Sequence, residues 1–325
     1  MLYTNEQMLD LFEGYLSQAE TPAEPELLYS PIVYSMSGGG KRLRPLLLLL
    51  TAQAFGGDAS AVMPAAVAVE VFHNFTLLHD DIMDNADMRR GKPSVYKRWG
   101  ANVAILSGDA MMICAYKTLS KINPDKLPRV VDMFSSMALQ VCEGQQYDMD
   151  FEKKRKVSVV DYIQMIESKT SALLSGAATI GAVLADAGEE DVRRIHRFAT
   201  ELGLAFQLQD DLLDVYGDPA VFGKAIGGDI TSNKKTYMLI NALQLADDRQ
   251  RAELERWIGM KEFDRTEKIA AVTAIYDEIG IRRLCEEKIN SCFAESGKYL
   301  DMVGVADERK ESLRRFTAGM MKREK

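Results

Sequence analysis

Two aspartate-rich segments of the chain have the residue types and the spacing of cation-binding sites. The first, "LLHDDIMDNADMRRG" at residues 77–91, places Asp80, Asp81, Asp84 and Asp87 close together. Asp80 and Asp84 are four residues apart, so on a helix they share one face and repel each other unless a cation lies between them. Oxygen ligands of this kind favour Mg²⁺. For a single motif of this type, a solvated acidic helix end is the alternative.

The second segment, "LAFQLQDDLLDVYGD", repeats the pattern with Asp210, Asp211 and Asp214. Gln207, Asp210 and Asp214 would share one face of a helix. Two helices that face their carboxylates across one cavity would form a site for several metal ions. Because Mg²⁺ commonly completes its coordination with waters and substrate phosphates, the pair of motifs predicts a phosphate-bearing substrate.

Basic residues lie where they could bind that phosphate. The segment "GGGKRLRP" places Lys41, Arg42 and Arg44 after three glycines and just before a proline that can begin a helix. Flexible backbone, a helix N-terminus and three cations favour phosphate binding, although the spacing is not that of a Walker loop. A basic surface turn is the alternative for this segment alone. Further basic residues follow the two aspartate motifs: Arg89, Arg90, Lys224, Lys234 and Lys235.

The elements that must position these motifs are predicted to be helices, because apolar residues recur every three or four positions. One such series is Val67, Val71, Phe75, Leu78 and Ile82. Prolines punctuate the helical stretches, and the last is Pro219. The small-residue segment "ALLSGAATIGAVLA" suits a central helix packed on all sides. Without a linker or a shift in composition, we expect one all-α domain over residues 1–325, a bundle of ten or more helices around a central cavity.

The bulk composition excludes several classes of protein. A net charge of −8 over 325 residues argues against a protein that coats nucleic acid. The N-terminal segment "MLYTNEQMLDLFEGYL" has no basic residue, so it is not a secretory signal, and the apolar run near it is too short to span a bilayer. Three histidines disfavour a histidine-based zinc site. The cysteines lack CxxC spacing and are expected to be buried free thiols in a reducing cytoplasm: Cys114, Cys142, Cys285 and Cys292.

Taken together, these motifs resemble those of the trans-prenyl diphosphate synthases, or polyprenyl synthetases, over nearly the whole chain. The resemblance rests on "GGGKRLRP", "HNFTLLHDDIMDNADMRRGKPS", "EGQQYDMDFE", "ESKTSALL", "FQLQDDLLDVYGD" and "GKAIGGDITSNKKT". It implies the all-α isoprenoid-synthase fold, a homodimer, and the head-to-tail condensation of isopentenyl diphosphate with an allylic diphosphate. Terpene cyclases usually lack the second DDxxD and the "GGGKRLRP" segment, and non-catalytic partner subunits typically lose one aspartate motif, so these two alternatives are disfavoured.

The resemblance also implies roles for single residues. Asp80 and Asp84 would bind two Mg²⁺ ions, and Asp210 a third with Asp214 and Asp211 completing its shell; Mn²⁺ is the alternative metal. Isopentenyl diphosphate would be held by Lys41, Arg44, His73 and Arg90. The allylic diphosphate would be held by Arg89, Lys169, Thr170, Gln207, Lys224 and Lys234, with Gln145 and Asp148 nearby. Those expected to act in catalysis are Asp80, Asp84, Lys169, Asp210 and Lys224.

The implied reaction suits this inventory of side chains. Breaking the allylic C–O bond leaves a diphosphate anion and a carbocation, and metal ions with cationic side chains stabilise the charge on the leaving group. The isopentenyl double bond then attacks the cation and a proton is lost. An apolar cavity would exclude water from the cation.

Product length is expected to depend on the helix before Asp80. In the resembling family a bulky residue at the fifth position before the first aspartate is typical of short-chain synthases, and Phe75 occupies that position. Phe72 and Thr76 lie on the same helix. An ideal helical wheel turns Phe75 away from the metal face, so packing against a neighbouring helix is its alternative role. We predict a product of fifteen to twenty carbons, with twenty favoured; a longer-chain synthase is the alternative.

Overall fold

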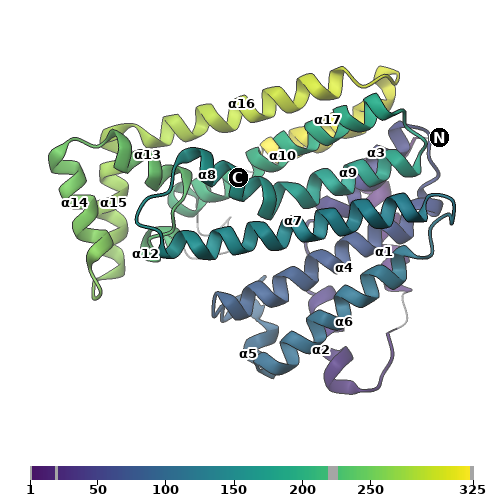
Figure 1. Ribbon diagram of the computed structural model, residues 1–325, viewed down its shortest axis with the longest axis horizontal. Coiled ribbons are helices and arrows are strands. Elements are labelled where there is room, and N and C mark those ends of the chain that lie inside the picture. The colour runs from purple at the N-terminus through teal and green to yellow at the C-terminus, as the bar shows by residue number, and fades with distance from the viewer. Residues whose placement is uncertain (1, 19–20, 219–225, 323–325) are drawn as a thin grey trace. The chain divides into compact units, whose positions relative to one another are not determined.

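The computed structural model describes residues 2–18, 21–218 and 226–322, and these are almost entirely α-helical (Figure 1). The helices in the first half are α1 (Asn5–Ser17), α2 (Glu26–Met36), α3 (Leu43–Ala54), α4 (Ala59–Met83), α5 (Val95–Trp99), α6 (Ala101–Leu119), α7 (Leu127–Lys153) and α8 (Val159–Ile166). The π-helical turn η1 (Glu167–Ser171) follows α8. The remaining helices are α9 (Ala172–Leu184), α10 (Glu189–Tyr216), α12 (Gly228–Thr231), α13 (Tyr237–Leu245), α14 (Asp248–Gly259), α15 (Arg265–Ile279), α16 (Ile281–Asp301) and α17 (Asp307–Met321). The prediction of an all-α protein with more than ten helices is confirmed.

The described strands form a two-stranded antiparallel hairpin that the sequence reading missed. Strands β1 (Met88–Arg89) and β2 (Lys92–Pro93) pair within the loop after the first aspartate motif. Arg90 and Gly91 form the turn with positive φ values of 53° and 74°, as expected for a tight hairpin turn. With two residues per strand, it is too short to show the alternation by which strands are recognised.

The chain forms two compact units. The first comprises Met1–Met137, Leu173–His196 and Met302–Phe316, and the second comprises Ala138–Ala172, Arg197–Asp301 and Thr317–Lys325. The first aspartate motif therefore belongs to one unit and the second to the other. The single domain over residues 1–325 and the shared central cavity remain predictions.

Helix α4 is the core element of the first unit, where it lies beside α6 (Figure 1). Gly108 of α6 allows this approach, because a Cβ atom there would lie 2.4 Å from Nε2 of His79. Among the described residues, α4 is the one helix long and apolar enough to cross a membrane, but 72% of its apolar segment is buried within the protein. Such burial is typical of a core helix.

Helix α9 contains the small-residue segment and is buried along almost its whole length, so the prediction of a closely packed helix is confirmed. Gly181 on α9 faces the backbone of α3: a Cβ atom there would lie 2.3 Å from the carbonyl oxygen of Leu48. Only a glycine permits this distance between the two helices.

Two details of the sequence-based prediction are wrong. Pro31 and Pro64 lie inside α2 and α4 and do not end them, although each lacks the N–H for one backbone hydrogen bond of its helix. The four cysteines are free, but only Cys285 and Cys292 are buried, whereas Cys142 is exposed on α7. Helical periodicity therefore did not distinguish the solvent-facing side of α7.

Candidate active site

In the first unit, α3 begins immediately after the glycine-rich segment. Its N-cap residue, Arg42, has a left-handed backbone conformation with φ 45° and ψ 35°, which is uncommon outside glycine. This conformation turns Arg42 into the protein, where it is only 5% exposed, while Lys41 remains exposed. The interpretation of Arg42 as a third phosphate-binding cation is therefore wrong, because its guanidinium group is occupied inside the fold.

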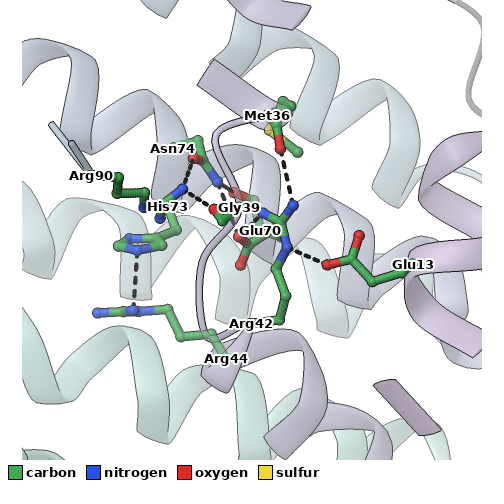
Figure 2. A network of polar contacts seen from close by, with 9 residues as sticks. All are labelled: Glu13, Met36, Gly39, Arg42, Arg44, Glu70, His73, Asn74 and Arg90. Atoms are coloured by element: carbon green, nitrogen blue, oxygen red, sulfur yellow. Dashed lines mark hydrogen bonds and ion pairs between the residues drawn. The ribbon is translucent and has the colours of Figure 1, made fainter. Parts of the chain in front are cut away.

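Arg44 and His73 meet side by side, as Figure 2 shows. Nη1 of Arg44 lies 3.1 Å from Nε2 of His73, and because a guanidinium can only donate, Nε2 must accept. Burial and the neighbouring guanidinium groups, chiefly Arg44 and Arg90, hold the pKa of His73 well below its ordinary value. His73 is therefore neutral at pH 7, and its acceptor nitrogen orients the Arg44 guanidinium.

The turn of the β-hairpin brings Arg90 to the same place. Its Nη1 donates to the carbonyl oxygen of Gly39 and, at 3.4 Å, to Oδ1 of Asn74 (Figure 2). Arg89, on β1, instead donates from Nε to Oδ1 of the buried Asp81 at 2.9 Å. The structure thus brings Arg44, His73 and Arg90 into one network, and it connects Arg89 to the first aspartate motif.

Asp80 and Asp84 lie one turn apart at the C-terminal end of α4. Asp84 is the C-cap residue, and its backbone N–H donates to the carbonyl oxygen of Asp80 at 2.8 Å. The partial negative charge of a helix C-terminus adds to that of the two carboxylates, so this end of α4 favours a cation. His73 precedes Asp80 by seven residues, or two turns, which places the two on one face of α4 about 10 Å apart along the axis.

In the second unit, Lys169 lies on the π-helical turn η1. A π-turn inside a helix is rare and often marks a functional site. Gly144 of α7 permits close packing between α7 and η1, because a Cβ atom at Gly144 would lie 2.2 Å from the backbone nitrogen of Lys169. The Lys169 ammonium group lies 2.6 Å from Oδ2 of Asp148 on α7, and that of Lys234 lies 3.7 Å from the same oxygen.

These two ammonium groups determine the charge of Asp148. Burial acts to raise the pKa of Asp148, but Lys234 and Lys169 together hold it below its ordinary value. Asp148 is thus ionised and fixes two of the cations predicted to bind the allylic diphosphate.

A second network joins η1 to α10. Thr170 donates to Oε1 of Gln207 at 2.7 Å, and Nε2 of Gln207 donates to Oδ1 of Asp211 at 2.9 Å. The buried hydroxyl of Tyr162 donates to the other oxygen of Asp211. Burial raises the pKa of Asp211 above its ordinary value. Both oxygens of Asp211 are used inside the protein, so this residue holds α8, η1 and α10 together.

The other two aspartates of the second motif are less buried than Asp211. Oδ2 of Asp214 accepts the backbone N–H of Asp229 at 2.9 Å, which fixes the first turn of α12. Burial and the negative charges of Asp211 and Asp214 raise the pKa of the Asp229 carboxyl. Helix α12 thus brings a further carboxyl, that of Asp229, to the second motif, which also includes Asp210. Lys224 lies outside the described residues.

The donors present fit Mg²⁺ chemically. They are carboxylate oxygens, the ligands that this ion prefers. Among residues 2–18, 21–218 and 226–322, no three acidic, histidine or cysteine side chains converge into a preformed metal cage. A Mg²⁺ ion held by one or two carboxylates here would complete its shell with waters and substrate phosphates, as Mg²⁺ usually does.

The sequence reading missed several residues of these networks. Glu13, Glu70 and Asn74 surround Arg42 and Arg90 in the first unit, and Tyr162 contacts Asp211 in the second. Glu70 and Asn74 are four residues apart within an apolar run of the sequence. A charged residue such as Glu70 in a segment predicted to be buried needs a partner, and this signal could have identified both residues. Glu13 and Tyr162 lie 29 and 49 residues from their partners, and no local pattern indicates such pairs.

The residues expected to control product length form part of an aromatic cluster in the first unit. The Phe72 ring lies 5.4 Å from that of Phe75 and 5.5 Å from that of Phe134 on α7. The Phe75 ring lies 4.7 Å from the ring of His79. The hydroxyl of Thr76 donates to the carbonyl oxygen of His73. Phe75 therefore packs along its own helix, while Phe72 faces α7.

Comparison with known proteins agrees with these features. A model of the polyprenyl synthetase family matches residues 25–277. A geranylgeranyl diphosphate synthase of Methanosarcina mazei is 45% identical over 222 residues, 68% of each chain, and a geranylfarnesyl diphosphate synthase of Aeropyrum pernix is 40% identical over 254 residues, 76% of this chain and 79% of the other. A crystal structure of a geranylgeranyl pyrophosphate synthase is 42% identical, with a TM-score of 0.95, and covers 99% of this chain and 100% of its own. The chain belongs to the polyprenyl synthetase family.

Proposed function

We propose that this protein condenses isopentenyl diphosphate with an allylic diphosphate, head to tail, and releases a short trans-prenyl diphosphate and pyrophosphate. The observation that carries the proposal is the arrangement on α4. A network of Arg44, His73 and Arg90, suited to an anion, lies two turns before the two carboxylates of Asp80 and Asp84. Paired aspartates beside basic residues suit a metal-bound diphosphate.

In this proposal Lys41, Arg44, His73 and Arg90 bind isopentenyl diphosphate. The neutral His73 supports this assignment, because it orients Arg44 without adding a charge of its own. Arg44 and Arg90 each offer several N–H donors in a planar fork, which matches phosphate oxygens.

The allylic diphosphate is assigned to a second set of residues. Asp148 holds Lys169 and Lys234 beside each other, so these two donors are already oriented before an anion arrives. Because these two donors are already in place, they need to move little when negative charge develops on the departing diphosphate. The Thr170 hydroxyl donates to Gln207 and would have to turn away from it to donate to a phosphate. The full set is Arg89, Lys169, Thr170, Gln207, Lys224 and Lys234, with Gln145 adjacent.

We assign the metal ions to Asp80 and Asp84 in the first unit and to Asp210 and Asp214 in the second. The family generally depends on Mg²⁺, and the proposal takes three ions. When bound, they would supply positive charge against the departing diphosphate. Each oxygen of Asp211 already accepts one hydrogen bond, from Tyr162 or Gln207, so we assign Asp211 a supporting place in this shell, directly or through water.

The product is proposed to be geranylgeranyl diphosphate, with twenty carbons. The aromatic cluster around Phe72 and Phe75 supports a closed pocket floor, and relatives named geranylgeranyl diphosphate synthases support the length. A twenty-five-carbon product is the second candidate, favoured by the geranylfarnesyl diphosphate synthase among the relatives.

We further propose that the protein is a cytoplasmic homodimer. Free cysteines suit a reducing compartment. Helix α6 exposes apolar side chains of Ile105, Leu106 and Ile113, with Leu106 60% and Ile113 65% exposed. Leu106 and Ile113 are seven residues apart, so they lie on one face, and an exposed apolar stripe of this kind favours contact with a second copy.

The test is a product assay. The purified protein is incubated with Mg²⁺, isopentenyl diphosphate and dimethylallyl, geranyl or farnesyl diphosphate, and the products are separated by mass spectrometry. We expect a prenyl diphosphate of twenty carbons with all three starters, and no product when EDTA removes the metal. Release of pyrophosphate without a longer prenyl chain would overturn the proposal.

A further inference from the structure

Arg42 ties three helices to the glycine-rich segment. Its Nε donates to Oε1 of Glu13 on α1 at 2.8 Å, its Nη1 to Oε1 of Glu70 on α4 at 2.7 Å, and its Nη2 to the carbonyl oxygen of Met36 at the end of α2 at 2.9 Å. Figure 2 shows the guanidinium group between these three acceptors. Arg42 therefore fixes the backbone between Met36 and α3, which includes Lys41.

The network continues from Arg42 to the proposed substrate-binding residues. Oε1 of Glu70 also accepts from Nδ2 of Asn74 at 3.1 Å, and Oδ1 of Asn74 accepts from Arg90. Arg90 in turn donates to the carbonyl oxygen of Gly39. Nδ2 of Asn74 also donates to the backbone carbonyl oxygen of Glu70 at 2.9 Å. Glu70 therefore orients Asn74, and Asn74 and Gly39 together position Arg90.

Glu13 differs from the other members of this network. It lies before residues 25–277, which match the family model, and its side chain is 46% exposed, compared with 2% for Glu70 and 3% for Arg42. Burial opposes the charge of Arg42, but hydrogen bonds and charge from Glu13 and Glu70 raise the pKa of Arg42 above its ordinary value. Two carboxylates thus share one guanidinium, and Glu13 is the partner that water can reach.

We propose that Glu13 is a positioning residue for isopentenyl diphosphate, acting from α1 through Arg42 on Lys41, Arg44 and Arg90. This inference rests on the proposed function and assigns a role in it to the N-terminal helix. Without the Glu13 carboxylate, Arg42 turns its free Nε toward Glu70. The Arg42 guanidinium then competes with Asn74 for Oε1 of Glu70, the oxygen to which both donate. The left-handed backbone at Arg42 also loses one of the contacts that hold it, and such a conformation persists only when its surroundings fix it.

The alternative is that the Glu13–Arg42 pair only stabilises the fold. Glu13 is the appropriate residue for separating the two roles, because an ion pair with an exposed partner contributes about 0–1 kcal/mol. A positioning role would change one Michaelis constant, whereas a purely structural role would change thermal stability or both constants together.

The experiment compares Glu13→Ala, which removes the acceptor for Nε of Arg42, with Asp10→Ala, which removes a carboxylate from an exposed position of the same helix. We expect Glu13→Ala to raise KM for isopentenyl diphosphate about tenfold, corresponding to about 1.4 kcal/mol. KM for the allylic diphosphate should change less than about twofold and Tm by less than about 4 °C, the shift expected for about 1 kcal/mol or less. Asp10→Ala should behave as the wild type.

An unchanged KM for isopentenyl diphosphate in Glu13→Ala, or an equal rise for both substrates, would overturn the inference. If the wild type forms no prenyl product, the proposed function itself fails, so the two failures are distinct. A double-mutant cycle with Arg42→Lys adds a second criterion. If Glu13 acts through Arg42, the two substitutions together raise KM by less than the product of their separate effects; independent effects would contradict it.

Discussion

Asp80 and Asp84 lie at the negative end of the α4 dipole, where two carboxylates one turn apart repel each other. Replacing either with Ala should lower kcat at least about a hundredfold, because several kcal/mol of leaving-group stabilisation are lost and each 1.36 kcal/mol is a factor of ten. Tm should stay the same or rise. Asp87→Ala is the matched control, since Asp87 belongs to the same motif but lies after the end of α4 and pairs with Lys97 at 2.7 Å. Near-normal turnover of either variant at saturating Mg²⁺ would refute the assignment.

The basic residues should divide between the two substrates. Lys41→Ala and Arg44→Ala should raise KM for isopentenyl diphosphate more than KM for the allylic diphosphate, and Lys224→Ala should do the reverse. A hydrogen bond to a charged group contributes about 1.5–3 kcal/mol, so each change should exceed about tenfold. Steady-state kinetics with one substrate varied at a time measures the split, and equal effects on both constants would contradict it.

His73 should make stability depend on pH. Its pKa is held well below the ordinary value of about 6.5, so below pH 6.5 the unfolded chain binds a proton that the folded protein excludes. The free energy of unfolding should therefore decrease as the pH is lowered below about 6.5, by up to about 1.4 kcal/mol per pH unit. Urea unfolding at pH 7.5, 6.5 and 5.5 tests this against His73→Gln, which keeps an acceptor for Arg44 but cannot titrate. Identical slopes for the two proteins would show that His73 does not contribute.

At the scale of elements, the sequence predicted what periodicity and local motifs encode. It located α4 and α10 with their aspartates and the turn before α3, because residues three and four apart determine a helix face. It did not predict that Arg42 points into the fold, since that depends on Glu13 and Glu70 in other helices. The π-turn η1 was also missed, because it depends on Gly144 and its close contact with Lys169.

The contact between α4 and α7 should limit the length of the product. Phe72 and Phe75 pack together, and Phe72 meets Phe134 of α7, so removing both rings would open space along α4. The double variant Phe72→Ala, Phe75→Ala should lengthen the product by at least one five-carbon unit, with Phe75→Ala alone giving a smaller shift. Mass spectrometry of the products measures this, and a Tm measurement verifies folding. An unchanged product distribution in a folded double variant would place the pocket floor elsewhere.

At the scale of the whole molecule, the family assignment rests on more than the two aspartate motifs. The family model covers residues 25–277, and the solved relative matches nearly every residue of both chains. The N-terminal helix α1 lies outside the family match and yet connects through Glu13 and Arg42 to the residues proposed to bind isopentenyl diphosphate. A raised KM in the Glu13 variant would show that a segment outside the family match influences substrate binding.

The last prediction concerns assembly. In a two-fold dimer the same face of α6 occurs on both sides of the interface, so each substitution acts twice. Two charges placed in a buried interface without partners cost several kcal/mol. Leu106→Glu with Ile113→Glu should therefore dissociate the protein from twice its chain mass of 36.3 kDa to the single chain. Light scattering after size-exclusion chromatography measures the mass. Val160→Glu is the control, because Val160 is 75% exposed on α8 and should leave the dimer intact. A dimer that persists in the α6 double variant would place the interface on another surface.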